Sequence, residues 1–64
     1  MMVYVEFIYV NVSGVHSTGE QEFKTPQMAL RFMYKASKTP NMFVKSYRCD
    51  DPYDKEWIDK RFRL

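Results

Sequence analysis

Residues 2–12 limit the possible folds of this chain more than any other segment, because eight of their eleven side chains are β-branched or aromatic. That composition predicts a long strand. Its two faces would carry Val3, Val5, Phe7 and Tyr9 on one side, and Tyr4, Glu6, Ile8, Val10 and Val12 on the other. A strand open to water on one side alternates more clearly between apolar and polar residues. We therefore expect the second face to be covered, either by the carboxyl-terminal segment or by a second subunit.

The core around this strand has to form without covalent or metal cross-links. The chain has 64 residues, and a domain of this size buries only about 60% of the surface of its unfolded chain. The single cysteine, Cys49, cannot form an internal disulfide, and together with the single histidine, His16, it cannot complete a structural zinc site. Five Phe, five Tyr, five Met and one Trp are therefore expected to build the core of a single domain over residues 1–64.

Turn and cap signals give the next elements along the chain. Residues 13–19 contain two glycines and are expected to form a loop. Residues 20–24 then return as a short strand, which makes a hairpin. Thr25 followed by Pro26 is typical of a helix start. This helix should end at about residues 37–38, because the residue before Pro40 disfavours helical geometry.

The last two elements complete an α+β fold. Residues 42–49 have the composition of a third strand. Asp51 and Pro52 are typical of the start of a second helix, whose acidic first turns and basic end match the helix dipole. The sequence therefore predicts the order ββαβα, with a three-stranded antiparallel sheet, one main helix and a short carboxyl-terminal helix elsewhere.

Each predicted helix has an apolar stripe. For the first helix the stripe consists of Met28, Ala29, Phe32, Met33 and Ala36, extended by Leu30. For the second helix it consists of Tyr53, Trp57, Ile58 and Phe62. The opposite side of the first helix carries Arg31, Lys35 and Lys38.

Basic residues are concentrated in the middle of the chain. Residues 23–49 contain six Lys and Arg and no acid, whereas residues 1–22 contain three Glu and no Lys or Arg. Nucleic-acid binding would use such charges for phosphate contacts. The same charges are also what the solvated face of any amphipathic helix carries. The candidate contacts are Lys24, Arg31, Lys35, Lys38, Lys45 and Arg48.

The sequence offers little for catalysis or metal binding. Cys49 and His16 are the only conventional nucleophile–base pair, and a thiol needs such a base within hydrogen-bond reach. Asp50 and Asp51 are too few to ligate a hard cation, and they fit a turn and a helix cap better. We therefore expect a non-enzymatic protein with no cofactor and no metal.

Self-association is expected because the first strand is apolar on both faces. A carboxyl-terminal helix of about ten residues spans only about 15 Å, whereas a strand of eleven residues spans about 35 Å. Part of the second face should stay uncovered in a monomer, and uncovered apolar area usually marks an interface. We predict a homodimer built from the first strand or the terminal helix, with candidate interface residues Tyr4, Ile8, Val10, Tyr53 and Trp57.

Location follows from what the sequence lacks. No stretch approaches the roughly 18 apolar residues of a membrane span, and the amino terminus meets Glu6 early and has no basic region typical of a signal peptide. A lone free thiol fits a reducing compartment. We expect a cytoplasmic protein, in the host cytoplasm if it is viral, that does not contact a membrane.

Two resemblances bear on function. The two-strand order ending in Phe23-Lys24-Thr25-Pro26, followed by a helix with Ala29 and Phe32, resembles the arm-site DNA-binding domains of tyrosine recombinases over residues 3–38. The whole chain resembles the small uncharacterised proteins of phages and prophages of Gram-positive bacteria, with its β-rich start and the strand-to-helix turn at residues 47–53. The second resemblance implies an accessory viral protein that binds another molecule, often host machinery.

The sequence favours a non-enzymatic interaction module that binds another protein or itself. The alternative is a small DNA- or RNA-binding protein that uses the basic face from Lys24 to Arg48. The two differ in salt dependence, because phosphate binding weakens steeply with salt and an apolar interface does not.

Overall fold

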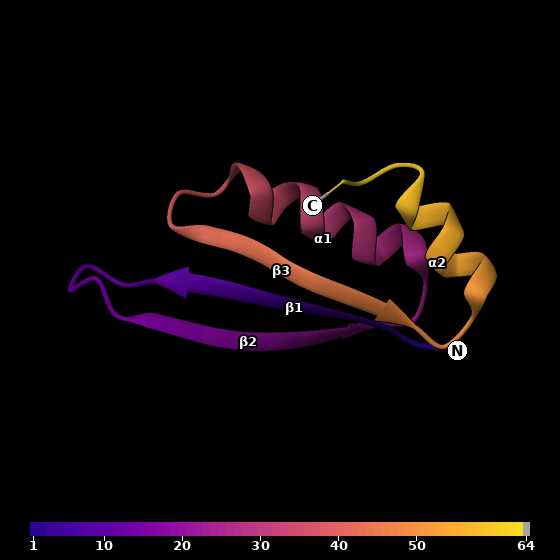
Figure 1. The fold of residues 1–64 in the computed structure, drawn as a ribbon, viewed down its shortest axis with the longest axis horizontal. Coiled ribbons are helices and arrows are strands. Elements are labelled where there is room, and N and C mark those ends of the chain that lie inside the picture. The colour runs from indigo at the N-terminus through magenta and orange to yellow at the C-terminus, as the bar shows by residue number, and fades with distance from the viewer. Residues whose placement is uncertain (64) are drawn as a thin grey trace.

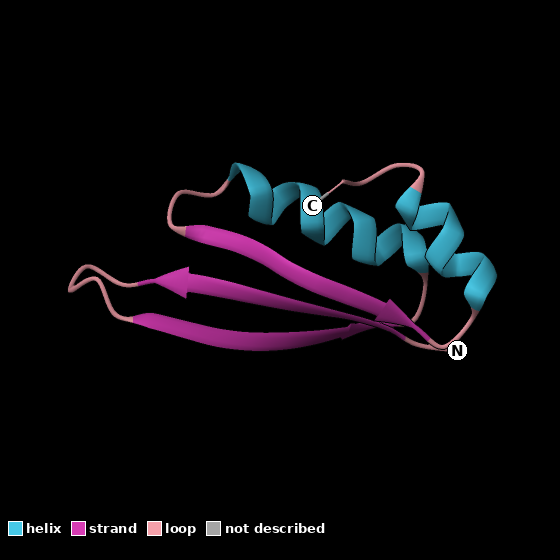
Figure 2. Cartoon of the chain, in the orientation of Figure 1, coloured by secondary structure: helices cyan, strands magenta, loops and turns pink. Residues whose placement is uncertain are grey.

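The computed structural model describes residues 1–63 and confirms the α+β order ββαβα (Figures 1 and 2). The elements are β1 (Val3–Val10), β2 (His16–Phe23), α1 (Pro26–Lys38), β3 (Met42–Cys49) and α2 (Pro52–Asp59). The molecule is elongated, with extents of 39 × 18 × 15 Å. Neither helix has the length and apolar character that crossing a bilayer requires.

The three strands form one antiparallel sheet in the order β2-β1-β3. The first strand of the chain is therefore the central one. Tyr4 pairs with Glu22 on β2 and with Arg48 on β3, and Ile8 pairs with Thr18 and Phe43. Each β1 residue and its two partners form one level of the sheet, so each level brings together three residues that are far apart in the sequence.

Both helices lie on the same side of the three strands (Figure 1). Helix α1 contacts all three strands, and α2 contacts β3 and α1. The core between these layers consists of Val3, Val5, Ala29, Leu30, Met33, Ile58 and Phe62. The carboxyl-terminal segment therefore does not cover the second face of β1, which corrects one of the two covers expected from the sequence. The cause is that α2 buries Ile58 in the same core as α1.

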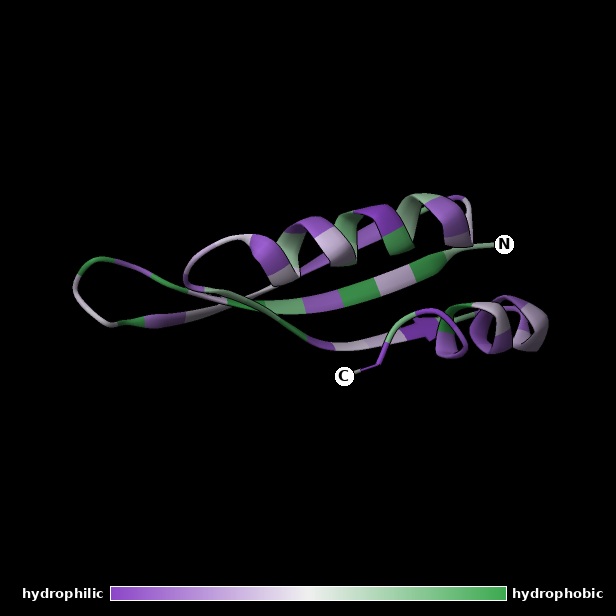
Figure 3. Ribbon diagram, turned by 90° about the horizontal axis from the view of Figure 1, so that it is seen from above, coloured by the Kyte–Doolittle hydropathy of each residue, from purple (hydrophilic) through white to green (hydrophobic). Residues whose placement is uncertain are grey.

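Helix α1 begins and ends as predicted, but its buried face is rotated. The side chain of Thr25 accepts a hydrogen bond from the Met28 amide at 3.2 Å, which satisfies one free donor at the helix start. Alternating apolar and polar bands along the helix show its amphipathic pattern (Figure 3). The buried residues are Ala29, Leu30, Met33 and Ala36. Met28 is 51% exposed, so its predicted place in the core is wrong.

Helix α2 begins at the predicted cap, where Asp51 accepts a hydrogen bond from the Tyr53 amide at 2.8 Å. Ile58 and, just beyond the helix, Phe62 are buried as expected. Tyr53 is 80% exposed and does not belong to the packed stripe. The Tyr47 hydroxyl on β3 donates to the Asp59 carboxylate on α2, which ties the helix to the sheet.

Strand β2 is longer than the sequence suggests. It begins at His16, so Gly19 lies inside the strand and not in a loop. Gly19 has no positive φ and pairs with Phe7. A Cβ built at Gly19 would meet the Phe7 ring at 2.6 Å. The glycine is therefore present because an aromatic ring from the neighbouring strand lies over it.

The loop between β1 and β2 is correspondingly short. Asn11 accepts hydrogen bonds from the amides of Ser13 and Val15 at 2.9 and 3.0 Å, and Gly14 has a φ of 80°. This turn projects beyond the end of α1, at the left of Figure 1. Strand β1 ends at Val10, two residues before the end predicted from the sequence.

A β-bulge divides β3 into two halves. Glu6 pairs with Ser46, and the next residue, Phe7, pairs with Val44, so Lys45 is the extra residue. Simple alternation would place Val44 with Ser46. The bulge instead puts Val44 on the same side as Tyr47 and Cys49, which pack against the core.

Candidate protein-interaction surface

The face of the sheet turned away from the helices is the candidate site. Within residues 1–63 both helices lie on the opposite side of the sheet (Figure 1). We call it the open face and define it by Tyr4, Glu6, Ile8, Val10, His16, Thr18, Glu20, Glu22, Phe43, Lys45, Ser46 and Arg48. Strand alternation and the bulge at Lys45 together bring these residues to one side.

One half of the open face is charged. The Lys45 ammonium lies 3.4 Å from the Glu6 carboxylate. The Arg48 guanidinium lies 4.0 Å from the centroid of the Tyr4 ring and 3.8 Å from the Glu20 carboxylate. Arg48 therefore reaches from β3 across β1 to β2. These pairs are exposed, so each stabilises the fold only slightly, but together they place the bases on β3 and the acids on β1 and β2.

The other half of the open face is apolar on β1 and β3, with the polar residues Thr18 and His16 beside it on β2. Ile8 and Val10 on β1 are half-buried, and Phe43, which pairs with Ile8, is 57% exposed. Val12 and Val15 in the projecting turn are also exposed. Five apolar side chains thus continue from the sheet into the turn. Exposed apolar area of this kind usually marks an interaction site.

The structure divides the predicted interface residues between two surfaces. Tyr4, Ile8 and Val10 lie on the open face, whereas Tyr53 and Trp57 lie on α2, which packs on the helix side of the sheet. The guanidinium of Arg61, just beyond α2, lies 4.1 Å from the Trp57 ring. Tyr53 and Trp57 line only a shallow depression of about 300 Å³, together with Glu56, Lys60 and Arg61.

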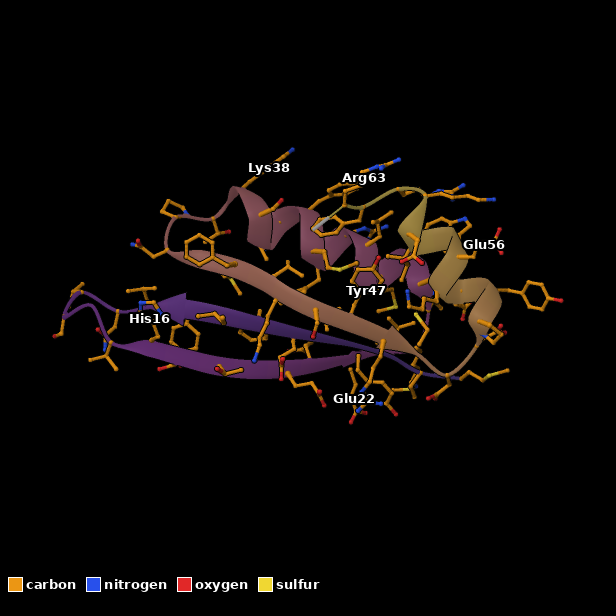
Figure 4. The ribbon with its side chains drawn as sticks, in the orientation of Figure 1. His16, Glu22, Lys38, Tyr47, Glu56 and Arg63 are labelled. Atoms are coloured by element: carbon orange, nitrogen blue, oxygen red, sulfur yellow. The ribbon has the colours of Figure 1, made fainter. Side chains whose placement is uncertain are left out.

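The six predicted nucleic-acid contacts also fall on separate surfaces. Arg31, Lys35 and Lys38 are exposed on α1, and within residues 1–63 no carboxylate lies within ion-pair distance of them. Lys45 and Arg48 lie on the open face and are paired with acids. Lys38 and Glu22 point away from opposite sides of the molecule in Figure 4. Lys24 is exposed between β2 and α1.

The candidate catalytic and metal-binding residues are not brought together. Cys49 pairs with Val3 and His16 with Val10, so they lie at opposite ends of the sheet. Burial and the nearby negative charge of Asp54 raise the pKa of the Cys49 thiol, which disfavours the reactive thiolate. Asp50 accepts a hydrogen bond from the Met2 amide, and Asp51 caps α2. Over residues 1–63 no group of three His, Cys, Asp or Glu could hold a metal ion.

Sequence analysis missed Phe43 as a member of the site. A strict alternation along β3 puts Phe43 on the same side as Tyr47, a residue that packs against the core. The bulge reverses this assignment. The pairing of Phe43 with Ile8 could have been found only from the strand register.

Comparison with protein-family models, with curated proteins and with solved structures finds no match for this chain. Its function therefore has to be argued from the open face and from the charges around the fold.

Proposed function

We propose that this protein is a non-enzymatic interaction module that binds another protein, or a second copy of itself, through the open face. The observation that carries the proposal is the uncovered apolar half formed by Ile8, Val10 and Phe43. A domain of this size has little apolar material to spare. Leaving these residues outside the core is best explained by a partner that covers them.

The layout of the open face supports a protein partner. Protein interfaces have an apolar centre depleted of charge and a polar rim. Here the apolar half adjoins a belt of ion pairs formed by Glu6, Glu20, Lys45 and Arg48. The separation of Cys49 from His16 supports a role without catalysis. We place the activity in the cytoplasm, where the free thiol of Cys49 would persist.

Site-specific photo-crosslinking in cells tests the proposal. A photoreactive amino acid at Phe43 reports on the open face, and the same amino acid at Tyr53 is the matched control, because both residues are highly exposed but lie on opposite sides of the sheet. We expect protein adducts from position 43 and few from position 53. Adducts only from position 53 would place the interface on α2, and none from either position would contradict the proposal.

The second candidate function is nucleic-acid binding, and the α1 surface favours it. Four bases elsewhere, Lys45, Arg48, Lys55 and Lys60, are paired with acids. Arg31, Lys35 and Lys38 have no such partner within residues 1–63 and follow one side of the helix. Arg31 and Lys35 also flank a small apolar depression of about 210 Å³ with Phe23, Met28 and Phe32.

Replacement of Arg31, Lys35 and Lys38 by Gln tests this second function. If the α1 surface binds phosphates, the triple variant should bind DNA or RNA more weakly, and the slope of affinity against salt should fall by up to about three. The control is Lys55→Gln with Lys60→Gln, which removes two exposed but paired bases, one on α2 and one at its C-cap. Absence of any mobility shift for the wild-type protein at low salt would rule this function out.

A further inference from the structure

We infer that the partner of the open face is a second copy of this chain, packed face to face about a two-fold axis that runs along β1. This inference rests on the proposed function and specifies its partner. Two-fold dimers are the commonest oligomers. What points to this particular dimer is the distribution of charge across the three strands.

The charges on the open face are self-complementary. At the level of Tyr4 the outer strands carry Glu22 on β2 and Arg48 on β3. At the level of Glu6 they carry Glu20 on β2, and Ser46 with the bulged Lys45 on β3. Acids therefore occupy one edge of the open face and bases the other, at matching heights.

A two-fold axis along β1 uses this arrangement directly. Such an axis places β2 of one copy over β3 of the other. Each row of paired residues across one sheet then faces the same row of the second copy. Glu22 then faces Arg48 of the second copy, and Glu20 faces Lys45. Thr18 faces Phe43, and the two copies of Ile8 meet on the axis. Two sheets packed face to face keep their strand directions within about 30° of each other. Residues near the centre of the interface therefore face each other as described.

The alternative two-fold axis, which runs across the strands, does not fit. It would reverse the levels and place the charged half of one copy over the apolar half of the other. Each strand would then lie over its own copy, so the Glu6 carboxylate would lose water against Ile8, and the Lys45 ammonium against Phe43, without gaining a partner, which is costly. The axis along β1 instead joins apolar to apolar and, between the outer strands, acid to base, while each Glu6 that meets its copy on the axis keeps its own Lys45 at 3.4 Å.

The two halves of the open face have different tasks in this dimer. Burial of Ile8, Val10 and Phe43 supplies most of the affinity, because the effect of apolar burial grows with area. The charged belt supplies orientation, since complementary charges mainly fix register and exclude wrong partners. Glu22, which has no ion-pair partner within residues 1–63, gains one from the second copy.

Charge reversal with sedimentation equilibrium tests the inference. The wild-type chain should sediment as a dimer at micromolar concentration. Glu20→Lys with Glu22→Lys, and separately Lys45→Glu with Arg48→Glu, should each raise the dissociation constant by about tenfold or more. Mixing the two variants should restore dimers, because acids and bases again face each other. Tyr53→Asp, on α2, is the control that should leave the dimer intact. Circular dichroism checks that each variant is folded.

Cross-linking with a short bis-maleimide tests the direction of the axis. In a Cys49→Ser background, Thr18→Cys and Phe43→Cys variants should cross-link when mixed, and neither should cross-link strongly alone. Ile8→Cys should cross-link to itself. Strong self-cross-linking of Thr18→Cys would instead indicate an axis across the strands and overturn the inference.

A monomer mass for the wild-type chain up to about 100 µM would also overturn the inference, because interfaces of this kind associate at lower concentrations. The proposed function would survive that result if photo-crosslinks from position 43 contained a different protein. The proposed function would fail together with the inference only if the photoreactive amino acid at position 43 formed no adduct with any protein.

Discussion

At the scale of single residues, the contact between Gly19 and the Phe7 ring sets the limit on how β2 can vary. The ring also lies 5.4 Å from the ring of Phe32, centroid to centroid, so it has packed neighbours beyond the glycine. We expect Gly19→Ala to lower the free energy of unfolding by about 1–2 kcal/mol, since the new methyl group displaces the ring. Urea denaturation measures the change. Gln21→Ala, on the same strand, is the control and should change it by less than about 0.5 kcal/mol. Equal stability of Gly19→Ala and Gln21→Ala would contradict the close contact between Gly19 and the Phe7 ring.

The hydrogen bond from Tyr47 to Asp59 makes stability depend on pH at both extremes. Burial and this hydrogen bond raise the pKa of Tyr47 from its ordinary value of 10.0 to about 12. The same hydrogen bond, together with the Lys55 ammonium at 3.0 Å, lowers the pKa of Asp59. A raised phenol pKa stabilises the fold fully below pH 10 and loses its effect as the pH rises to about 12. A lowered carboxyl pKa stabilises the fold above about pH 4 and loses its effect as the pH falls.

Replacement of Tyr47 by Phe should therefore flatten both limbs of the stability curve. We expect the free energy of unfolding of Tyr47→Phe to change less than that of the wild type between pH 10 and 12, and also below about pH 4. Tyr53→Phe, which removes the hydroxyl of an exposed tyrosine, is the matched control. Denaturant titrations across the pH range measure both variants. A Tyr47→Phe curve parallel to the wild-type curve would show that the hydrogen bond contributes nothing.

At the scale of elements, the orientation of α1 can be tested with its two methionines. Met33 is fully buried, whereas Met28 is 51% exposed. Met33→Ala should lower the free energy of unfolding by about 2–5 kcal/mol because it leaves a cavity in the core. Met28→Ala should lower it by less than about 1 kcal/mol. Thermal melts followed by circular dichroism compare them, and equal losses would mean that the helix faces the sheet differently.

The parts of the fold that depend on local chemistry could be predicted from the sequence. Thr25 and Asp51 cap their helices because a side-chain oxygen placed before a helix satisfies its free amides. The first half of β2 could not be predicted. Its residues are polar, and Gly19 is typical of a loop unless the Phe7 ring on the neighbouring strand is known.

The candidate site was only partly predictable for the same reason. Alternation along the first strand was enough to place Tyr4, Ile8 and Val10 together. It could not show that the bulge at Lys45 adds Phe43, nor that Tyr53 lies on the helix side. Which surfaces share a side of the molecule depends on tertiary packing, which short-range patterns do not encode.

At the scale of the whole molecule, the helices stabilise one end of the sheet more than the other. Val3 and Val5 are covered by the core, whereas Val10 lies near the projecting turn. We expect the amides of Val3 and Val5 to exchange with deuterium at least about tenfold more slowly than that of Val10, although Val10 donates a hydrogen bond to Asn41 at 2.8 Å. The measurement uses NMR at a concentration where the protein is monomeric. Uniform protection along β1 would contradict a division into two ends.

The position of the first strand at the centre of the sheet also has a kinetic consequence. The β1–β2 hairpin closes across a short turn, but the amide of Met2, next to β1, bonds Asp50, 48 residues further along the chain. Closing so long a loop costs entropy before the contacts it permits are gained. The hairpin can therefore form early, while the other edge of β1 stays unpaired until β3 arrives. During that interval the most apolar strand of the chain has a free edge, so aggregation competes with folding until the third strand docks.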